Sequence, residues 1–262
     1  MKLGFVNLVA AADAVSASSS ASGYPAANVQ TPQRPFLPWR STATTEQWVK
    51  VDFGDPTSLE VVAPIHANVT TLTVQGHATD VWTSPSYSVA LTIGRNPWNR
   101  RYQAAQLPVG FNYRYLRLLI GAQTPVDGAA YFSLGGLWAG TLDEAPRDIR
   151  YEYEIETLEP RVDIQPDHGG WRERLTLGEP LTRLLAHRVA LVSEDSPAGL
   201  GDELEDWLDY DRQMGVSDYV LTLLERGSAR HVWVARRLST PTWRVARPLA
   251  TSDIEFEEVL GP

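Results

Sequence analysis

The sequence predicts a mainly β protein, in which a jelly-roll sandwich is followed by a second β domain with one packed α-helix. Three observations support this prediction. Short apolar runs alternate with polar residues along most of the chain. Glycine, proline and asparagine separate these runs, and only one stretch has clear helical periodicity.

The clearest predicted strand of the first part covers residues 47–53. Val49, Val51 and Phe53 alternate there with Lys50 and Asp52, which is typical of a half-buried strand. The Gly-Asp-Pro turn at 54–56 is expected to end it. Further strands are expected at 1–10, 61–65, 71–75, 87–93, 113–120 and 131–138, whereas residues 11–35, rich in Ala, Ser, Gln and Pro, are expected to be extended and exposed.

The character of the sequence changes after Gly140, where residues 141–147 are typical of a linker. Strands are then expected at 149–155, 162–164, 172–177, 188–193, 219–224, 231–236, 243–245 and 254–260. A helix is predicted at 202–214, because Asp202 and Glu205 have the spacing of a capping box and Gly215 follows the last apolar residue.

These patterns divide the chain into three parts. Residues 1–14 form an N-terminal strand that is a candidate to pair with the second domain, and residues 15–140 form the sandwich. Residues 147–262 form a β-rich ring or oligomerisation domain that carries the helix.

The composition excludes several classes of protein. Cysteine is absent, which excludes disulfides, thiol nucleophiles and thiolate metal sites. Up to Pro146 nine basic residues balance nine acidic ones, so the net charge of −9 lies entirely in the second half. An acidic second half argues against nucleic-acid binding, which needs a basic face.

The N-terminus has the superficial look of a signal peptide, but Asn7 and Asp13 interrupt its apolar run. We therefore expect no signal peptide. No run of 18 apolar residues occurs, so we expect no membrane insertion.

No pattern in the sequence indicates catalysis or a cofactor. The five histidines show no metal-binding spacing, there is no G-x-S-x-G motif, and the glycines at 135–136 lack the helix that follows a phosphate-binding loop. Glu152, Glu154 and Glu156 share one strand face, which usually means solvent exposure rather than a catalytic pair. We expect a protein that is not an enzyme and holds no metal or cofactor.

The best candidate for a functional site is the segment 94–102, which concentrates arginine, asparagine and aromatic residues between two predicted strands. Such residues stack on sugar rings and bond to hydroxyls, but they also dominate subunit contacts. Ligand binding, subunit contact and local packing therefore remain open. The candidate residues are Trp98, Arg100, Arg101 and Tyr102, followed by Trp82, Trp39 and Arg40.

Several short motifs resemble the discoidin, or galactose-binding-like, family. They are YPAANV at 24–29, WRS at 39–41, QWVKVDFG at 47–54 and YLRL at 115–118. Their order and spacing are similar to those of the opening and a late strand of discoidin domains. The resemblance covers roughly residues 15–140 and implies a β-sandwich, but it transfers no set of sugar-binding residues.

A second resemblance is to phage tail proteins that carry such a module. It rests on NLV at 7–9, the serine run that follows, WRS at 39–41, IHANVT at 65–70, LGGLWAG at 134–140 and the acidic FEE at 256–258. Relatives tend to have His and Asn adjacent where this chain has Ala67 between them. The resemblance implies a distal-tail or baseplate-ring protein in the virion. Its implied partners are the tail tube, the hub and further copies of itself in a ring, with a hexamer as the expected order.

The favoured interpretation is thus that the protein is a structural component of a phage tail tip. An accessory carbohydrate-binding module for a host surface glycan is compatible with this role. The alternative is a dedicated carbohydrate-binding protein for receptor recognition. A third hypothesis, a glycan-cleaving enzyme, would require two close carboxylates in a cleft.

Overall fold

The computed structural model describes residues 2–31, 37–93 and 104–144 and the backbone of the strands between residues 153 and 258. The chain divides into two compact units, which are described separately below. The sandwich unit comprises Lys2–Glu144 and Val220–Val234, and the second unit comprises Ala145–Tyr219 and Ala235–Pro262.

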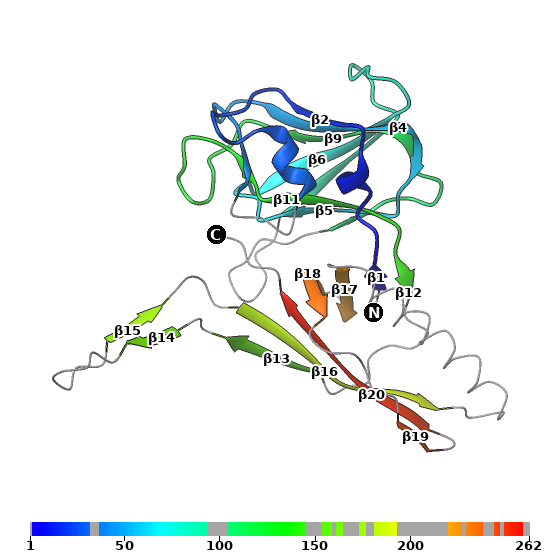
Figure 1. The fold of residues 1–262 in the computed structure, drawn as a ribbon. Helices are drawn as coiled ribbons and strands as arrows, with labels where there is room; N and C mark the ends of the chain where they lie inside the picture. The colour runs from blue at the N-terminus through cyan, green and yellow to red at the C-terminus, as the bar shows by residue number, and fades with distance from the viewer. Residues whose placement is uncertain are drawn as a thin grey trace. The chain divides into compact units, whose positions relative to one another are not determined.

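One layer of the sandwich unit is a five-stranded antiparallel sheet (Figure 1). Its strands, in spatial order, are β2 (Ala14–Ala17), β4 (Gln47–Ser58), β9 (Asn112–Ile120), β6 (Thr71–His77) and β7 (Tyr87–Thr92). Alternation in the sequence gives each strand one buried face. In β4, Val49 and Val51 are fully buried, whereas Trp48 and Lys50 lie on the outer face.

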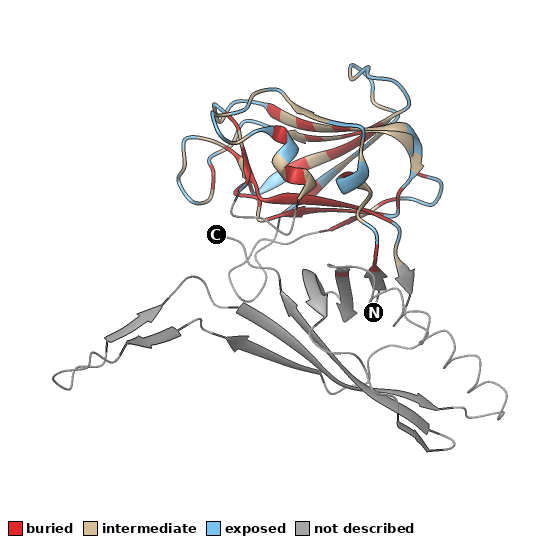
Figure 2. Ribbon diagram, viewed as in Figure 1, coloured by how far each residue is buried: buried red, intermediate tan, exposed pale blue. Residues whose placement is uncertain are grey.

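The opposite layer is a three-stranded sheet in the order β11 (Gly136–Gly140), β5 (Val61–Ile65) and β8 (Ala105–Gln106). Every residue of β5 and β11 is buried, as the red strands in Figure 2 show. A strand covered on both faces needs a continuous apolar run, and VVAPI in β5 supplies one. Two short strands, β3 (Trp39–Arg40) and β10 (Ser133–Leu134), pair with each other in a separate two-stranded antiparallel sheet.

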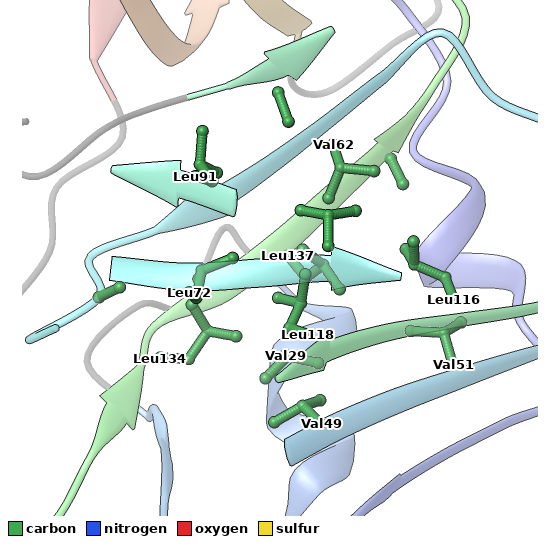
Figure 3. Packing of buried hydrophobic residues seen from close by; sticks show 14 of the residues in the cluster. Val29, Val49, Val51, Val62, Leu72, Leu91, Leu116, Leu118, Leu134 and Leu137 are labelled. Carbon is green, nitrogen blue, oxygen red and sulfur yellow. The ribbon is translucent and has the colours of Figure 1, made fainter. Parts of the chain in front are cut away.

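The hydrophobic core fills the space between the two layers. Figure 3 shows side chains of β4 and β9, such as Val51 and Leu118, approaching Val62 of β5 and Leu137 of β11. Trp39 and Phe132 are among its fully buried side chains. Loss of one such large side chain typically costs about 3–5 kcal/mol, so this core holds the loops that it anchors.

Residues 2–31 lie in the sandwich unit. The strand predicted at 1–10 is confined to Lys2–Gly4, and residues 11–31, predicted to be exposed, are exposed or half-buried except for the buried Ala26 and Val29. After β1 (Lys2–Gly4) come two short 3-10 helices, η1 (Leu8–Ala11) and η2 (Ala26–Gln30), with β2 between them. Their Val9 and Val29 are fully buried. The Asn7 amide nitrogen donates to Leu137 O (3.0 Å), and Asn7 Oδ1 accepts from Ala139 N (3.1 Å), so a side chain joins this segment to β11.

The Gly-Asp-Pro motif at 54–56 does not end its strand, contrary to the prediction. β4 continues to Ser58, and its register against β9 jumps from Asp52↔Tyr115 to Thr57↔Tyr113. Additional residues on one strand make a bulge, which accepts both Pro56 without an amide donor and Gly54 at φ +81°. The motif was therefore a bulge rather than a turn.

β1 pairs with two strands that lie far from it in the sequence. It is antiparallel to β12 (Asp143–Glu144) on one side and to β17 (Val220–Arg226) on the other. The first strand thus shares a sheet with a strand from the second half of the chain. The predicted boundaries of the three parts remain predictions.

The second unit is also built from antiparallel strands. β16 (Leu181–Val192) pairs with β13 (Tyr153–Leu158) and β20 (Leu249–Glu258), and β20 also pairs with β19 (Arg244–Ala246). The ends of β18 (Ala229–Arg237) and β20 pair, and β14 (Arg161–Ile164) pairs with β15 (Glu173–Thr176). The mainly β fold class is confirmed, while the helix predicted at 202–214 lies outside the described residues.

Packing at Gly76 gives a test of the sandwich. A Cβ atom at Gly76 of β6 would lie 2.6 Å from the rings of Phe111 and Tyr113, which meet edge to face with centroids 4.8 Å apart. We expect Gly76→Ala to lower the free energy of unfolding by about 1–3 kcal/mol, because overpacking forces these rings to move.

The matched control is Gly121→Ala, since a Cβ there has no atom within 4 Å. Urea denaturation should show a change within about 0.5 kcal/mol for this control. Equal effects of the two substitutions would contradict the packing described for Gly76.

Candidate ligand site at Arg40

The candidate residues from the sequence fall into two groups. Trp98, Arg100, Arg101 and Tyr102 lie outside the described residues, so their role stays a prediction. Trp39, Arg40 and Trp82 are described, and they occupy three different environments.

Trp39 is an anchor in the core. Its side chain is fully buried, and its indole Nε1 donates to Ser19 O at 2.9 Å. A buried indole needs such an acceptor. Trp39 therefore holds the loop that carries Ser19 and supports its neighbour Arg40, instead of presenting its own ring to a ligand.

The Arg40 guanidinium contacts two tyrosine rings. Its guanidinium carbon is 3.9 Å from the ring centroid of Tyr24 and 4.8 Å from that of Tyr131. Both distances are within the range of a cation–π contact. We call these three residues the arginine–tyrosine site. All three side chains are partly exposed.

The Arg40 guanidinium has no hydrogen-bond acceptor or carboxylate partner among the described residues. Its Nε is buried without a partner, whereas its two terminal nitrogens keep contact with solvent. Buried polar atoms in proteins usually have a partner, and an unpaired one costs about 1–3 kcal/mol. A charged group held in place without an acceptor is therefore a candidate ligand contact.

Backbone hydrogen bonds hold the Tyr24 side of the site. Ala21 N donates to Arg40 O (2.8 Å), and Arg40 N donates to Tyr24 O (3.4 Å). The chain turns between Ala21 and Tyr24, where Gly23 has φ +81° and Tyr24 N donates to Ala21 O. The positive φ needs glycine, because a Cβ would be strained there.

The buried side chain of Asn68 holds the Tyr131 side. Its amide nitrogen donates to Tyr131 O (3.0 Å) and to both carboxylate oxygens of Asp127 (3.2 Å), while its Oδ1 accepts from Ser133 N (2.7 Å). Ser41, also buried, accepts from Phe132 N through its hydroxyl oxygen (2.8 Å). The loop that carries Tyr131 is thus fixed on both sides.

Sequence reasoning found Arg40 but missed both tyrosines. Tyr24 lies in the YPAANV motif, which was noted only for its resemblance to a family. Tyr131 carries no local pattern that marks it. Its proximity to Arg40 arises from the pairing of β3 with β10, which joins Ser133 to Arg40.

Trp82 belongs to a different surface, the outer face of the five-stranded sheet. The Arg117 guanidinium lies 4.3 Å from its ring centroid, and its Nε1 donates to Asp80 Oδ1 at 2.6 Å. Asp80 also accepts from Lys50 Nζ (2.5 Å). The hydrogen bonds from Lys50 and Trp82 hold the pKa of Asp80 below its ordinary value.

The charged groups described on this sheet face are paired with one another. The Arg114 guanidinium donates to both oxygens of Asp52 (2.8 and 3.0 Å), and Arg117 Nε donates to Gln75 Oε1 (2.7 Å). Burial lowers the pKa of Arg117. Because these cations already have acceptors, the face stabilises the sheet more readily than it binds a ligand.

A pocket of about 520 Å³ lies elsewhere on the sandwich unit, between residues 58–60, the 106–111 segment and residues 141–142. Glu60 is the one acidic residue among its described lining, and it accepts a hydrogen bond from Leu142 N (2.8 Å). None of the described candidate residues lines this pocket. Its described lining holds no pair of carboxylates of the kind that glycoside hydrolysis requires.

Two further features bear on the class of site. In the part of the chain whose side chains are described, no three His, Cys, Asp or Glu residues come together as metal ligands. The helices described there are all too short or too polar to cross a bilayer.

No protein-family model matches this chain, and no curated protein matches it. Solved structures similar to it include the lectin domain of lectinolysin complexed with Lewis B antigen, at 12% identity and a TM-score of 0.42, covering 51% of this chain and 95% of that one. The second chitosan-binding module of a Paenibacillus sp. IK-5 chitosanase/glucanase, in complex with chitotriose, has 18% identity and a TM-score of 0.41, covering 52% and 100%.

The family 32 carbohydrate-binding module of NanJ from C. perfringens, in complex with galactose, has 11% identity and a TM-score of 0.41, covering 53% and 98%. Each of these three modules has a saccharide bound in its structure. Because their TM-scores are below 0.5, we base the function of this chain on its own residues.

The Asp52–Arg114 pair predicts a pH-dependent stability. Hydrogen bonds from Arg114 lower the pKa of Asp52 in the folded state. A lowered folded pKa gives stability that is complete above the unfolded value of about 4 and is lost as pH falls through the folded value. We expect Asp52→Asn to cost about 1 kcal/mol at pH 7 and much less near pH 2.

Urea denaturation of the wild type and the variant at both pH values measures this difference. Asp55→Asn is the control, because Asp55 is exposed on the β4 bulge. It should have little effect at either pH. A cost for Asp52→Asn that is the same at pH 7 and pH 2 would show that the ion pair is not its source.

Proposed function

We propose that the sandwich unit is a carbohydrate-binding module and that its ligand contacts the arginine–tyrosine site. The observation that carries this proposal is the Arg40 guanidinium, which contacts the rings of Tyr24 and Tyr131 but has no hydrogen-bond acceptor in the described part of the chain. Saccharides are rich in hydroxyl oxygens that accept from such donors, and the tyrosine hydroxyls can add further hydrogen bonds.

The rigidity of the site favours binding. Stacking on two rings restricts the long Arg40 side chain, and the buried Asn68 and Ser41 restrict the Tyr131 loop. A side chain that is already ordered loses less conformational entropy when a ligand arrives. A ligand acceptor would also satisfy donors that otherwise have only solvent.

The proposal is binding without catalysis. An arginine supplies hydrogen bonds and positive charge but remains protonated at any physiological pH. The guanidinium and the two tyrosine rings therefore serve to recognise a ligand rather than to react with it.

Substitution of Arg40 tests this function. We expect Arg40→Ala and Tyr131→Ala to weaken binding to a saccharide identified on a glycan array by about tenfold or more, because each removes a central contact. Isothermal titration calorimetry measures the affinity, and circular dichroism checks that each variant is folded.

The matched control is Arg114→Ala on the sheet face, where the arginine is paired with Asp52. Its affinity for the saccharide should equal that of the wild type. Loss of binding in this control with full binding in Arg40→Ala would place the ligand on the sheet face and overturn the assignment.

We also propose, as a second function, a structural role in a phage tail tip within the virion. It rests on the sequence resemblance to tail proteins. The observation that favours it is the pairing of β1 with β17, which joins the start of the chain to its second half in one sheet. A binding module on a tail ring and a ring subunit are compatible roles.

Light scattering after size-exclusion chromatography tests this second role. We expect a ring of about six copies, alone or with tail-tube and hub proteins, since heterologous interfaces close into rings. A monomer at all concentrations that joins no tail protein would refute it.

A further inference from the structure

We propose that Arg40 selects acidic saccharides, namely sugars that carry a carboxylate, over neutral ones. This inference rests on the proposed function and specifies the ligand class of the same site. Three features of the site support it. Arg40 has no oxygen acceptor among the described residues, one edge of its guanidinium is open to a ligand, and its surroundings strengthen a hydrogen bond to a charged acceptor.

Arg40 differs from the other described cations of the sandwich in having no oxygen acceptor. Four lysine or arginine side chains are described in this unit. Lys50 pairs with Asp80, Arg114 with Asp52, and Arg117 donates to the Gln75 amide oxygen. Only Arg40, within that set of four, has no oxygen acceptor, so its charge is left for a ligand.

The free edge of Arg40 has the geometry of carboxylate recognition. Aromatic rings flank the guanidinium, and its Nε edge is buried. A ligand therefore reaches the edge formed by the two terminal nitrogens. Two parallel N–H donors match the two oxygens of one carboxylate, a bidentate arrangement that a single hydroxyl does not fill.

The surroundings strengthen a charged interaction. Burial of Nε and contact with two rings keep water from part of the guanidinium, and an ion pair is stronger where water is excluded. Hydrogen bonds between charged partners are roughly twice as strong as neutral ones. An acidic sugar should thus bind about tenfold or more tightly than its neutral counterpart.

Matched sugars isolate the carboxylate. The full chain is titrated at low salt with galacturonate, its methyl ester and galactose, and with glucuronate, its methyl ester and glucose. We expect at least one acid to bind about tenfold more tightly than its ester, which has the same ring without the charge. This advantage should shrink as salt is raised.

Two variants assign the preference to Arg40. Arg40→Gln, which stays polar but neutral, should reduce the acid-to-ester ratio to about one. Arg114→Gln changes the charge of the sandwich by the same amount and should keep the ratio. Thermal denaturation establishes that both variants are folded, and the salt dependence of the wild type is a readout that needs no variant.

The outcomes separate this inference from the proposed function. If esters and neutral sugars bind as tightly as acids, and Arg40→Ala abolishes the binding of all of them, the inference of acid selectivity is wrong but the proposed binding function stands. If no saccharide binds at millimolar concentration, both fail. A preference for acids that survives in Arg40→Gln overturns the inference, as does tighter binding of galactose 6-sulfate than of galacturonate.

Discussion

Burial of Trp39 determines where Arg40 points, and the proposed site depends on this one constraint. Successive residues of a strand face opposite sides, so in the two-residue strand β3 a ring in the core places the next side chain away from it. The hydrogen bond from the Trp39 indole to Ser19 O then brings the 18–24 loop, with Tyr24, next to the same strand. Hydrophobic packing and a polar surface group are thereby coupled through neighbouring residues.

Where the strands end, buried amide and hydroxyl side chains form the hydrogen bonds to backbone groups that strand pairing would otherwise supply. Asn7 bonds to both neighbours of Trp138 in β11, and Asn68 bonds to backbone groups of Tyr131 and Ser133. A buried polar side chain is stable only with its partners in place, so each of these residues specifies one loop path. The loops of the sandwich are consequently ordered by its core rather than by their own sequences.

Local pattern predicted the strands well, because alternation in β4 and the apolar run in β5 follow directly from which faces are buried. It failed where tertiary contacts decide. The 54–56 motif satisfies turn chemistry and bulge chemistry equally, and Val29 is buried although it lies in a stretch whose composition is that of an exposed segment. At the site, Arg40 was found from its residue type, but its lack of a partner is a property of the folded chain. Tyr131 is joined to it by bonds such as that between Ser41 and Phe132, which are 91 residues apart.

The two arginine-bearing surfaces of the sandwich show how a structural role and a binding role differ physically. On the sheet face, Arg114 and Arg117 have acceptors in the described chain, so their hydrogen bonds already contribute to folding. Arg40 has aromatic neighbours but no acceptor, and its buried Nε costs about 1–3 kcal/mol that the core must offset. A folded domain tolerates such a cost at few positions, and those positions concentrate at functional sites. The physical reason to expect a ligand at Arg40 is that its guanidinium has no acceptor among the described residues, so a bound oxygen can pair with the terminal nitrogens while the core continues to offset the cost of the buried Nε.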